Sequence, residues 1–211
     1  EEYAEIISDE DVTDGNVLPE ESIPANHMCQ TGDTVAWATG DGDEGELTVK
    51  NIQVLTNIAD LSKEDFSDYG GEIAPFADES GNLKAINGVT DIKDENGIHE
   101  GSEENQVVLV KVSCKIVNTT EETREYYMNT LSLKGIKELS NRVTIDYDMI
   151  PDYKNGVSEW MIYMTNAQYT TEDECEKSFF EFSLAPGECK DIDCAFLTYE
   201  NSLKDTGLIF N

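Results

Sequence analysis

The chain has 211 residues, of which 45 are Asp or Glu and 14 are Lys or Arg, so its formal net charge is −31 at pH 7. The few Lys and Arg residues of so acidic a chain cannot form a basic surface that binds phosphate groups. This excludes nucleic-acid binding and argues against anionic lipid as a ligand. Hydrophobic residues make up 38% of the sequence, enough for a core over part of its length, and no apolar run approaches the roughly 20 residues of a membrane-spanning helix.

Residues 1–30 are predicted to form an acidic, largely disordered tether ahead of a single folded domain at 31–211. The first 49 residues contain 14 acids and neither Lys nor Arg. Such a segment cannot bury enough apolar surface to offset an ordering entropy of about 1–2 kcal/mol per residue. The alternative is a short edge strand near Ile6 or Val17. Because no Met and no basic leader precede the first residue, we expect a mature product that follows a signal peptide or a lipid-modified Cys.

Two β-prone runs, Thr34 to Thr39 and Glu46 to Thr56, flank a turn rich in Gly and Asp. Together they predict a hairpin. In the second run the parity of the apolar residues changes between Val49 and Ile52. This change predicts a bulge near Asn51.

One or two helical turns are expected at 61–69, because Ser62 can cap them and Asp65, three residues later, nearly completes a capping box. Residues 70–105 are rich in Gly, Asp, Asn and Glu and contain only isolated apolar residues. This stretch is too long for an ordinary connection. We therefore predict an irregular acidic insertion, a loop excursion with short local pairings on which a functional surface could protrude.

The strongest strand is predicted at 106–118, because apolar residues occupy one parity there while the opposite parity carries Lys111, Ser113 and Lys115. The residues expected to face the core are Val108, Val110, Val112, Cys114 and Ile116.

Further β-prone runs lie at 124–136, 142–150 and 157–165. In the last of these runs Trp160 has the parity of its apolar neighbours, so we expect it in the core. The chain ends in three closely spaced strands that predict a meander: 179–184, 189–199 and 203–210. About eight or nine strands with one short helix predict an all-β fold built as a two-sheet sandwich.

Two segments carry a resemblance to known domains. The first is the strand QVVLVKVSCKIVN, which runs into NTTEET, and the second is the ending FFEFSLAPGECKDIDCAFLTYENSLKDTGLIFN. Together they resemble uncharacterised immunoglobulin-like domains of secreted proteins and lipoproteins from clostridial Gram-positive bacteria. The resemblance covers residues 106–211, with 33–56 as the first strands. It implies an immunoglobulin-like sandwich at the cell surface and brings no catalytic residues, while the insertion at 70–105 departs from the pattern.

The five cysteines do not predict a zinc site, because none form a Cys-x-x-Cys pair and the two histidines stand far from them. Cys114 and Cys194 both have the inward parity of their strands. Two alternatives stay open for them, an inter-sheet disulfide in an oxidising location and a pair of buried thiols acting as small hydrophobes.

The density of carboxylates raises the hypothesis of calcium binding, since Ca²⁺ prefers hard oxygen ligands. Neither candidate cluster completes an EF-hand loop: when Gly97 takes the sixth position, Ile92 stands where the first Asp is required. Solvated turns are the simpler interpretation, so no cofactor is predicted and the metal ligands stay unassigned. The two clusters are Asp41, Asp43, Glu44 and Glu46 in the first hairpin, and Asp91, Asp94, Glu95 and Asn96.

No catalytic residue is predicted. His27 and His99 stand in no setting typical of Ser-His or Cys-His catalysis, and His99 is expected as an exposed side chain in a polar loop. A platform for a sugar or a peptide is the remaining hypothesis for a site. Its candidate side chains are Trp37, Trp160, Tyr126 and Tyr127.

The sequence thus favours an extracellular, lipid-anchored binding or accessory module at a bacterial cell surface, with a protein or glycan partner and no catalysis. The first alternative is a carboxylate-dependent hydrolase whose cleft is formed by the insertion at 70–105. The second alternative is a structural spacer made rigid by calcium.

Overall fold

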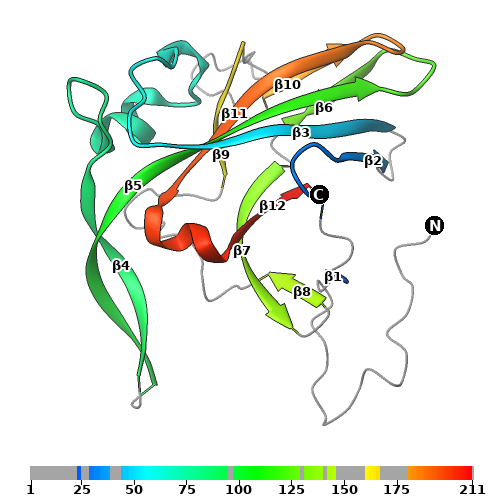
Figure 1. Ribbon diagram of the computed structural model, residues 1–211. Coiled ribbons are helices and arrows are strands. Elements are labelled where there is room, and N and C mark those ends of the chain that lie inside the picture. Colours follow the sequence, from blue (N-terminus) through cyan, green and yellow to red (C-terminus); the bar gives the residue numbers. More distant parts are fainter. Residues whose placement is uncertain are drawn as a thin grey trace, which may run out of the picture.

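The computed structural model describes residues 23–24, 29–38, 44–94, 97–128, 131–139, 142–145, 160–166 and 180–210. This part of the chain is mostly β (Figure 1), which confirms the all-β prediction. The strands are β1 (Ile23–Pro24), β2 (Thr34–Ala38), β3 (Glu44–Leu55), β4 (Ala85–Asp94), β5 (Gly97–Asn118), β6 (Arg124–Tyr127), β7 (Leu131–Leu139), β8 (Arg142–Ile145), β9 (Met161–Met164), β10 (Glu181–Leu184), β11 (Cys189–Tyr199) and β12 (Thr206–Phe210). The short helical segments are η3 (Lys63–Asp65), η4 (Tyr69–Ile73), η5 (Ala74–Phe76) and η9 (Glu200–Asp205).

β5 is the central strand of the largest sheet, whose order is β2-β3-β5-β11-β9, with β4 also paired to β5. Every pairing in this sheet is antiparallel. The predicted hairpin is confirmed as β2–β3. β3 shifts register between Val49 and Asn51, which confirms the predicted bulge. β-branched residues fill much of β5, as suits a strand with neighbours on both edges.

Both faces of β5 are buried at its centre. The five predicted inward residues are all buried, from Val108 to Ile116. Most of them join a core cluster with residues of β3, β6, β7, β9, β10 and β11. On the opposite face Val107 and Leu109 are buried in a second cluster, together with Ile73 and other residues of the segment that precedes β4. The sequence predicted one buried face because apolar and polar residues alternate only in the later half of the strand.

The three C-terminal strands exist, but they do not form a meander. β10 pairs with β6, β11 pairs with β5 and β9, and β12 pairs with β7. β12 thereby joins a separate sheet of order β1-β8-β7-β12, and β6 and β10 form a two-stranded ribbon. The meander prediction is wrong because η9 separates β11 from β12 along the chain. These two strands are close in sequence but do not pair with each other.

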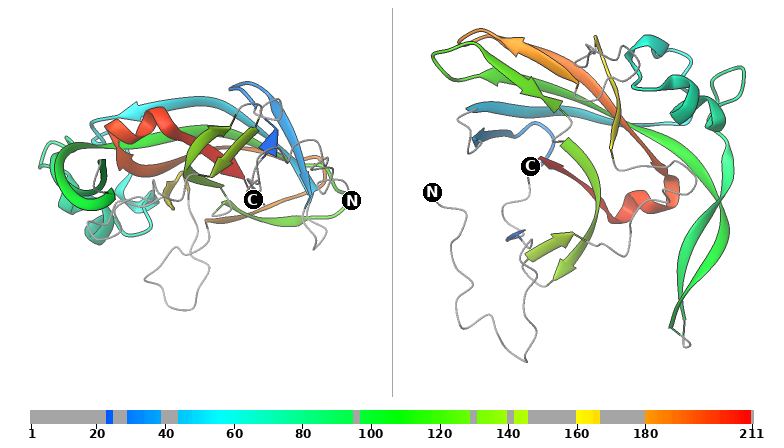
Figure 2. Two further views of the ribbon diagram at one scale, coloured as in Figure 1. Left: turned by 90° about the horizontal axis from the view of Figure 1, so that it is seen from below. Right: turned by 180° about the vertical axis from the view of Figure 1, so that it is seen from behind.

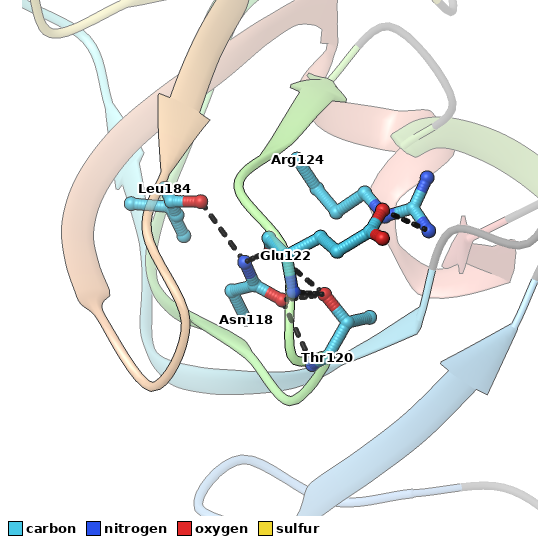
Figure 3. Close-up of polar contacts among 5 residues, drawn as sticks. All are labelled: Asn118, Thr120, Glu122, Arg124 and Leu184. Atoms are coloured by element: carbon cyan, nitrogen blue, oxygen red, sulfur yellow. Dashed lines mark hydrogen bonds and ion pairs between the residues drawn. The ribbon is translucent and has the colours of Figure 1, made fainter.

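Asn118, at the end of β5, holds the ribbon and the turn after β10 together (Figure 3). Its Nδ2 group donates to the carbonyls of Glu122 (2.8 Å) and Leu184 (2.9 Å), and its Oδ1 atom accepts from the N–H and hydroxyl of Thr120. Its backbone N–H donates to the Glu188 carbonyl, and its own carbonyl accepts from Gly187. The two segments that carry the family resemblance are therefore joined by one buried side chain.

Much of the region expected to be an irregular insertion is a regular hairpin. β4 pairs with the first half of β5 from Ala85↔Gln106 to Asp94↔Gly97, and Figures 1 and 2 show the hairpin projecting from the rest of the molecule. The prediction of an irregular loop at 85–105 is wrong, because backbone pairing does not require the apolar alternation by which a strand is recognised in sequence.

The helical turn expected near residue 61 is present as η3, but the capping box is not. Ser62 occupies the N-cap position without a capping hydrogen bond from its side chain. The Asp65 carboxylate instead accepts from the backbone N–H of Asn166, at 3.0 Å. A long-range bond thus replaces the local one.

Candidate functional site

The ribbon β6–β10 separates the two tyrosines proposed as a platform. Tyr126 is buried, its ring stacks on Phe182 at 5.8 Å, and its hydroxyl donates to the Glu44 carbonyl at 3.0 Å. Tyr127 points to the other face and is 41% exposed. Tyr126 is therefore a core residue, contrary to the platform hypothesis, and Tyr127 is an exposed aromatic side chain.

Two carboxylates flank Tyr127 on the outer face of this ribbon. Glu181 is its direct cross-strand partner, and the Tyr127 hydroxyl donates to Glu125 Oε2 at 3.4 Å. Desolvation, followed by the charge of Glu125 and a hydrogen bond between the two side chains, raises the pKa of Glu181.

Trp160 was expected in the core, and this expectation is wrong. The residue lies just before β9 and is 53% exposed, with Lys134 Nζ 5.7 Å from the centre of its ring. The parity argument fails because all four residues of β9 are buried, so alternation says nothing about the residue that precedes the strand. The Trp37 side chain lies outside the described part of the structure.

Cys114 and Cys194 lie on adjacent strands of one sheet, so the inter-sheet placement is wrong. Cys114 pairs with Ile192, and Cys194 pairs with Val112, which makes the two thiols diagonal neighbours. Both are buried and neither is in a disulfide. This finding confirms the alternative of two buried thiols.

A hydrogen bond with the Cys114 thiol, together with burial, raises the pKa of Cys194, so the sulfur stays protonated at neutral pH. Diagonal neighbours in an antiparallel sheet have Cα atoms about 7–8 Å apart, beyond the usual reach of a disulfide. Cys29 and Cys189 are exposed, and Cys175 lies outside the described residues.

The calcium hypothesis receives no ligand set from the described residues, among which no three His, Cys, Asp or Glu side chains gather in a metal-binding arrangement. Asp91 and Asp94 belong to strand β4 rather than to a loop, and Glu44 and Glu46 belong to β3. The remaining candidates, Asp41, Asp43, Glu95 and Asn96, lie outside the described residues.

His99 lies in β5, opposite Ile92 of β4. The expectation of a polar loop around it is therefore wrong. His27 lies outside the described residues.

A polar network joins β5, β11 and Thr165, the residue that follows β9. Its side chains from β5 and β11 lie on the face opposite the first core cluster. The Asp193 carboxylate accepts from Ser113 Oγ at 2.6 Å and pairs with Lys111 Nζ at 2.9 Å. Its backbone carbonyl accepts from the Thr165 N–H at 2.8 Å. Burial acts to raise the pKa of Asp193, but the hydrogen bonds from Ser113 and Lys111 and the charge of Lys111 outweigh it and lower the pKa.

We expect the substitution Asp193→Asn to remove a pH-dependent part of the stability. A carboxylate whose pKa is lower in the folded than in the unfolded chain stabilises the fold above the unfolded value, about 3.8, and loses this contribution as the pH falls through the folded value. The free energy of unfolding, measured in urea, should thus differ between wild type and variant at pH 7, and the difference should shrink as the pH falls below about 3.8. Asp191→Asn is the control, since its ion pair with Lys50 is exposed and contributes little. An Asp193→Asn difference that does not change with pH would contradict the assignment.

An apolar strip on β3 is the feature that the sequence did not single out. Ile52 and Val54 pair with Val112 and Val110, so they lie on the face that forms the first core cluster. They are nevertheless 44% and 48% exposed, whereas Val110 and Val112 are buried. Their alternation with polar neighbours predicted a half-buried strand, but not that its apolar half would reach the surface.

No protein family, curated protein or solved structure matches the chain. None of the helices in the described ranges is long and apolar enough to cross a membrane.

Proposed function

We propose that this chain is a non-catalytic binding module of the immunoglobulin-like sandwich type, held at a bacterial cell surface by a lipid anchor upstream of it. The location rests on the resemblance of residues 106–211 to domains of clostridial secreted proteins and lipoproteins. The packing of β6, β7 and β10 on one face of the large sheet, around the first core cluster, is compatible with such a sandwich.

The exposure of Ile52 and Val54 is the observation that carries the binding proposal. Each apolar side chain left in water forgoes about 25 cal/mol for every Å² that could be buried. These two β-branched side chains sit beside each other on a face that is otherwise core, at the end of a strand, and a partner that covers them would recover this free energy. An aliphatic surface of this kind suits a protein partner better than a glycan, for which the exposed ring of Tyr127 is the alternative contact.

Binding of the purified, fluorescently labelled chain to washed clostridial cells tests the proposal. We expect saturable binding that falls about tenfold in the double variant Ile52→Ser and Val54→Ser, because two apolar contacts are lost. Tyr127→Ser, which removes an exposed apolar side chain on another surface, should bind like the wild type. Protease treatment of the cells should abolish binding, and digestion of their cell-wall glycan should not. A wild-type chain that does not bind saturably would overturn the proposal.

A further inference from the structure

The hydrogen-bond pattern of β5 fixes which backbone groups of β3 face outward. Asn118 exchanges backbone bonds with Gly187 and Glu188, at the β11 side, so the even-numbered residues of β5 bond toward β11. The odd-numbered residues bond toward β3 and β4, as the bond from Val107 N–H to the Lys84 carbonyl shows.

The same alternation then applies along β3. Asn51, Gln53 and Leu55 lie opposite the odd-numbered residues of β5, so their N–H and C=O groups are used within the sheet. The N–H and C=O groups of Ile52 and Val54 therefore point away from β5, to the outer edge.

Among the described residues, no strand covers this outer edge. β2 pairs with β3 only from Glu44 to Thr48, as Figure 1 shows at one end of β3. Beyond it, the Gly32 N–H donates to the Val49 carbonyl, and at the far end the Leu83 N–H donates to the Thr56 carbonyl. Between these two bonds, the outer edge of β3 at residues 50–55 pairs with no described strand. We call this stretch the β3 window.

The window has two of the devices that protect a sheet edge, and both stand at its start: Lys50 and the bulge between Val49 and Asn51. Residues 51–55 contain neither a charged residue nor Pro. Its two faces differ in chemistry. Ile52 and Val54 continue the apolar face, while Asn51 and Gln53 lie opposite Ser113 and Lys111 on the polar face. A strand added here must have apolar residues on one face and polar residues on the other.

We infer that the β3 window binds an extended segment of a partner protein by antiparallel strand addition, with apolar residues beside Ile52 and Val54 and Lys or Arg at the intervening positions. This inference rests on the proposed function and names the partner's chemistry. Basic residues are favoured because a chain of net charge −31 attracts a cationic segment. The same charge opposes a second copy of this chain in the window.

Amide exchange of the unbound chain tests the geometry on which the inference depends. We expect the amides of Ile52 and Val54 to exchange fast and those of Gln53 and Leu55 to be protected, because only the second pair bonds to β5. Adding a capped heptapeptide in which three valines alternate with lysine and threonine should slow exchange at Ile52 and Val54 alone. Uniform protection along 51–55 before the peptide is added would overturn the inference.

The substitution Val54→Pro separates backbone from side-chain recognition. It removes an outward N–H, which an edge strand tolerates, and should weaken binding of the heptapeptide about tenfold relative to Val54→Ala, which keeps the N–H and loses the side chain. Equal affinities of the two variants would show side-chain docking without strand addition, which overturns the inference and leaves the proposed function standing. Melting temperatures confirm that both variants are folded.

Modified peptides provide a matched test on unaltered protein. N-methylation of the valines removes donors that face β3 and should abolish binding, whereas N-methylation of the lysines and threonines, which face away, should not. Replacing the lysines by glutamates should weaken binding as well. If the unmodified peptide does not bind at concentrations up to about 1 mM, the inference fails, and the cell-binding assay decides separately on the proposed function.

Discussion

Replacing Asn118 by Asp is expected to destabilise the chain by about 4 kcal/mol at pH 7, a large share of the roughly 5–15 kcal/mol typical of a folded domain. The reason is that Nδ2 donates to the carbonyls of Glu122 and Leu184 in a fully buried position. A carboxylate oxygen in its place faces two acceptors without a proton to share and carries a charge that burial disfavours. The free energy of unfolding in urea, followed by far-UV circular dichroism, measures the loss.

Two further variants separate the causes of this loss. Asn118→Ala should cost about 3 kcal/mol, since the same carbonyls lose their donor but no charge is buried. Thr119→Ala, at the exposed next residue, should change stability by less than about 0.5 kcal/mol. At pH 4 the loss in Asn118→Asp should shrink relative to pH 7, because a protonated Asp can donate to one of the two carbonyls. A loss in Asn118→Asp no larger than that in Thr119→Ala would contradict the proposed role.

The sequence predicted those parts of the fold in which local pattern and tertiary packing agree. The β2–β3 hairpin, its bulge next to Asn51 and the inward face of β5 follow from alternating apolar residues. β4 was missed because its polar residues, from Asn87 to Lys93, show no such alternation although they pair regularly with β5. Strand pairing at the C-terminus was missed because β10, β11 and β12 each bond to a strand far away in sequence.

The candidate surface was harder to predict than the fold. Periodicity shows that Ile52 and Val54 share a face, but their exposure depends on where β2 begins, which is set by the pairing of Thr34 with Thr48. The expectation of Trp160 in the core and the platform hypothesis for Tyr126 are wrong for a similar reason, since the start of β9 and the stacking of Tyr126 on Phe182 depend on tertiary structure. Sequence patterns locate apolar side chains, whereas the neighbouring strands decide which of them remain exposed.

Removing the side chain of Phe196 should cost about 3–5 kcal/mol, as is typical of a large aromatic residue replaced by Ala in a packed core. Phe196 is fully buried on β11 and belongs to the first core cluster. It pairs with Val110 of β5 on one side and with Met161 of β9 on the other, next to a shift of register between β11 and β9. Because backbone pairing continues on both sides, the surrounding strands cannot close the cavity by a local movement.

The variants Phe196→Leu and Tyr127→Ala define the scale of this effect. Leu keeps most of the buried volume and should cost less than about 1.5 kcal/mol, and Tyr127→Ala, which removes an exposed ring, should cost less than about 1 kcal/mol. Unfolding in urea measures all three variants. If Phe196→Ala costs no more than Tyr127→Ala, the first core cluster does not hold the large sheet together. If Phe196→Ala is the most destabilising of the three variants, it should also speed amide exchange at the even-numbered residues of β5, since these bond to β11. The outward amides of Ile52 and Val54 should exchange as fast as before, because no strand of the described residues pairs with the outer edge of β3 there.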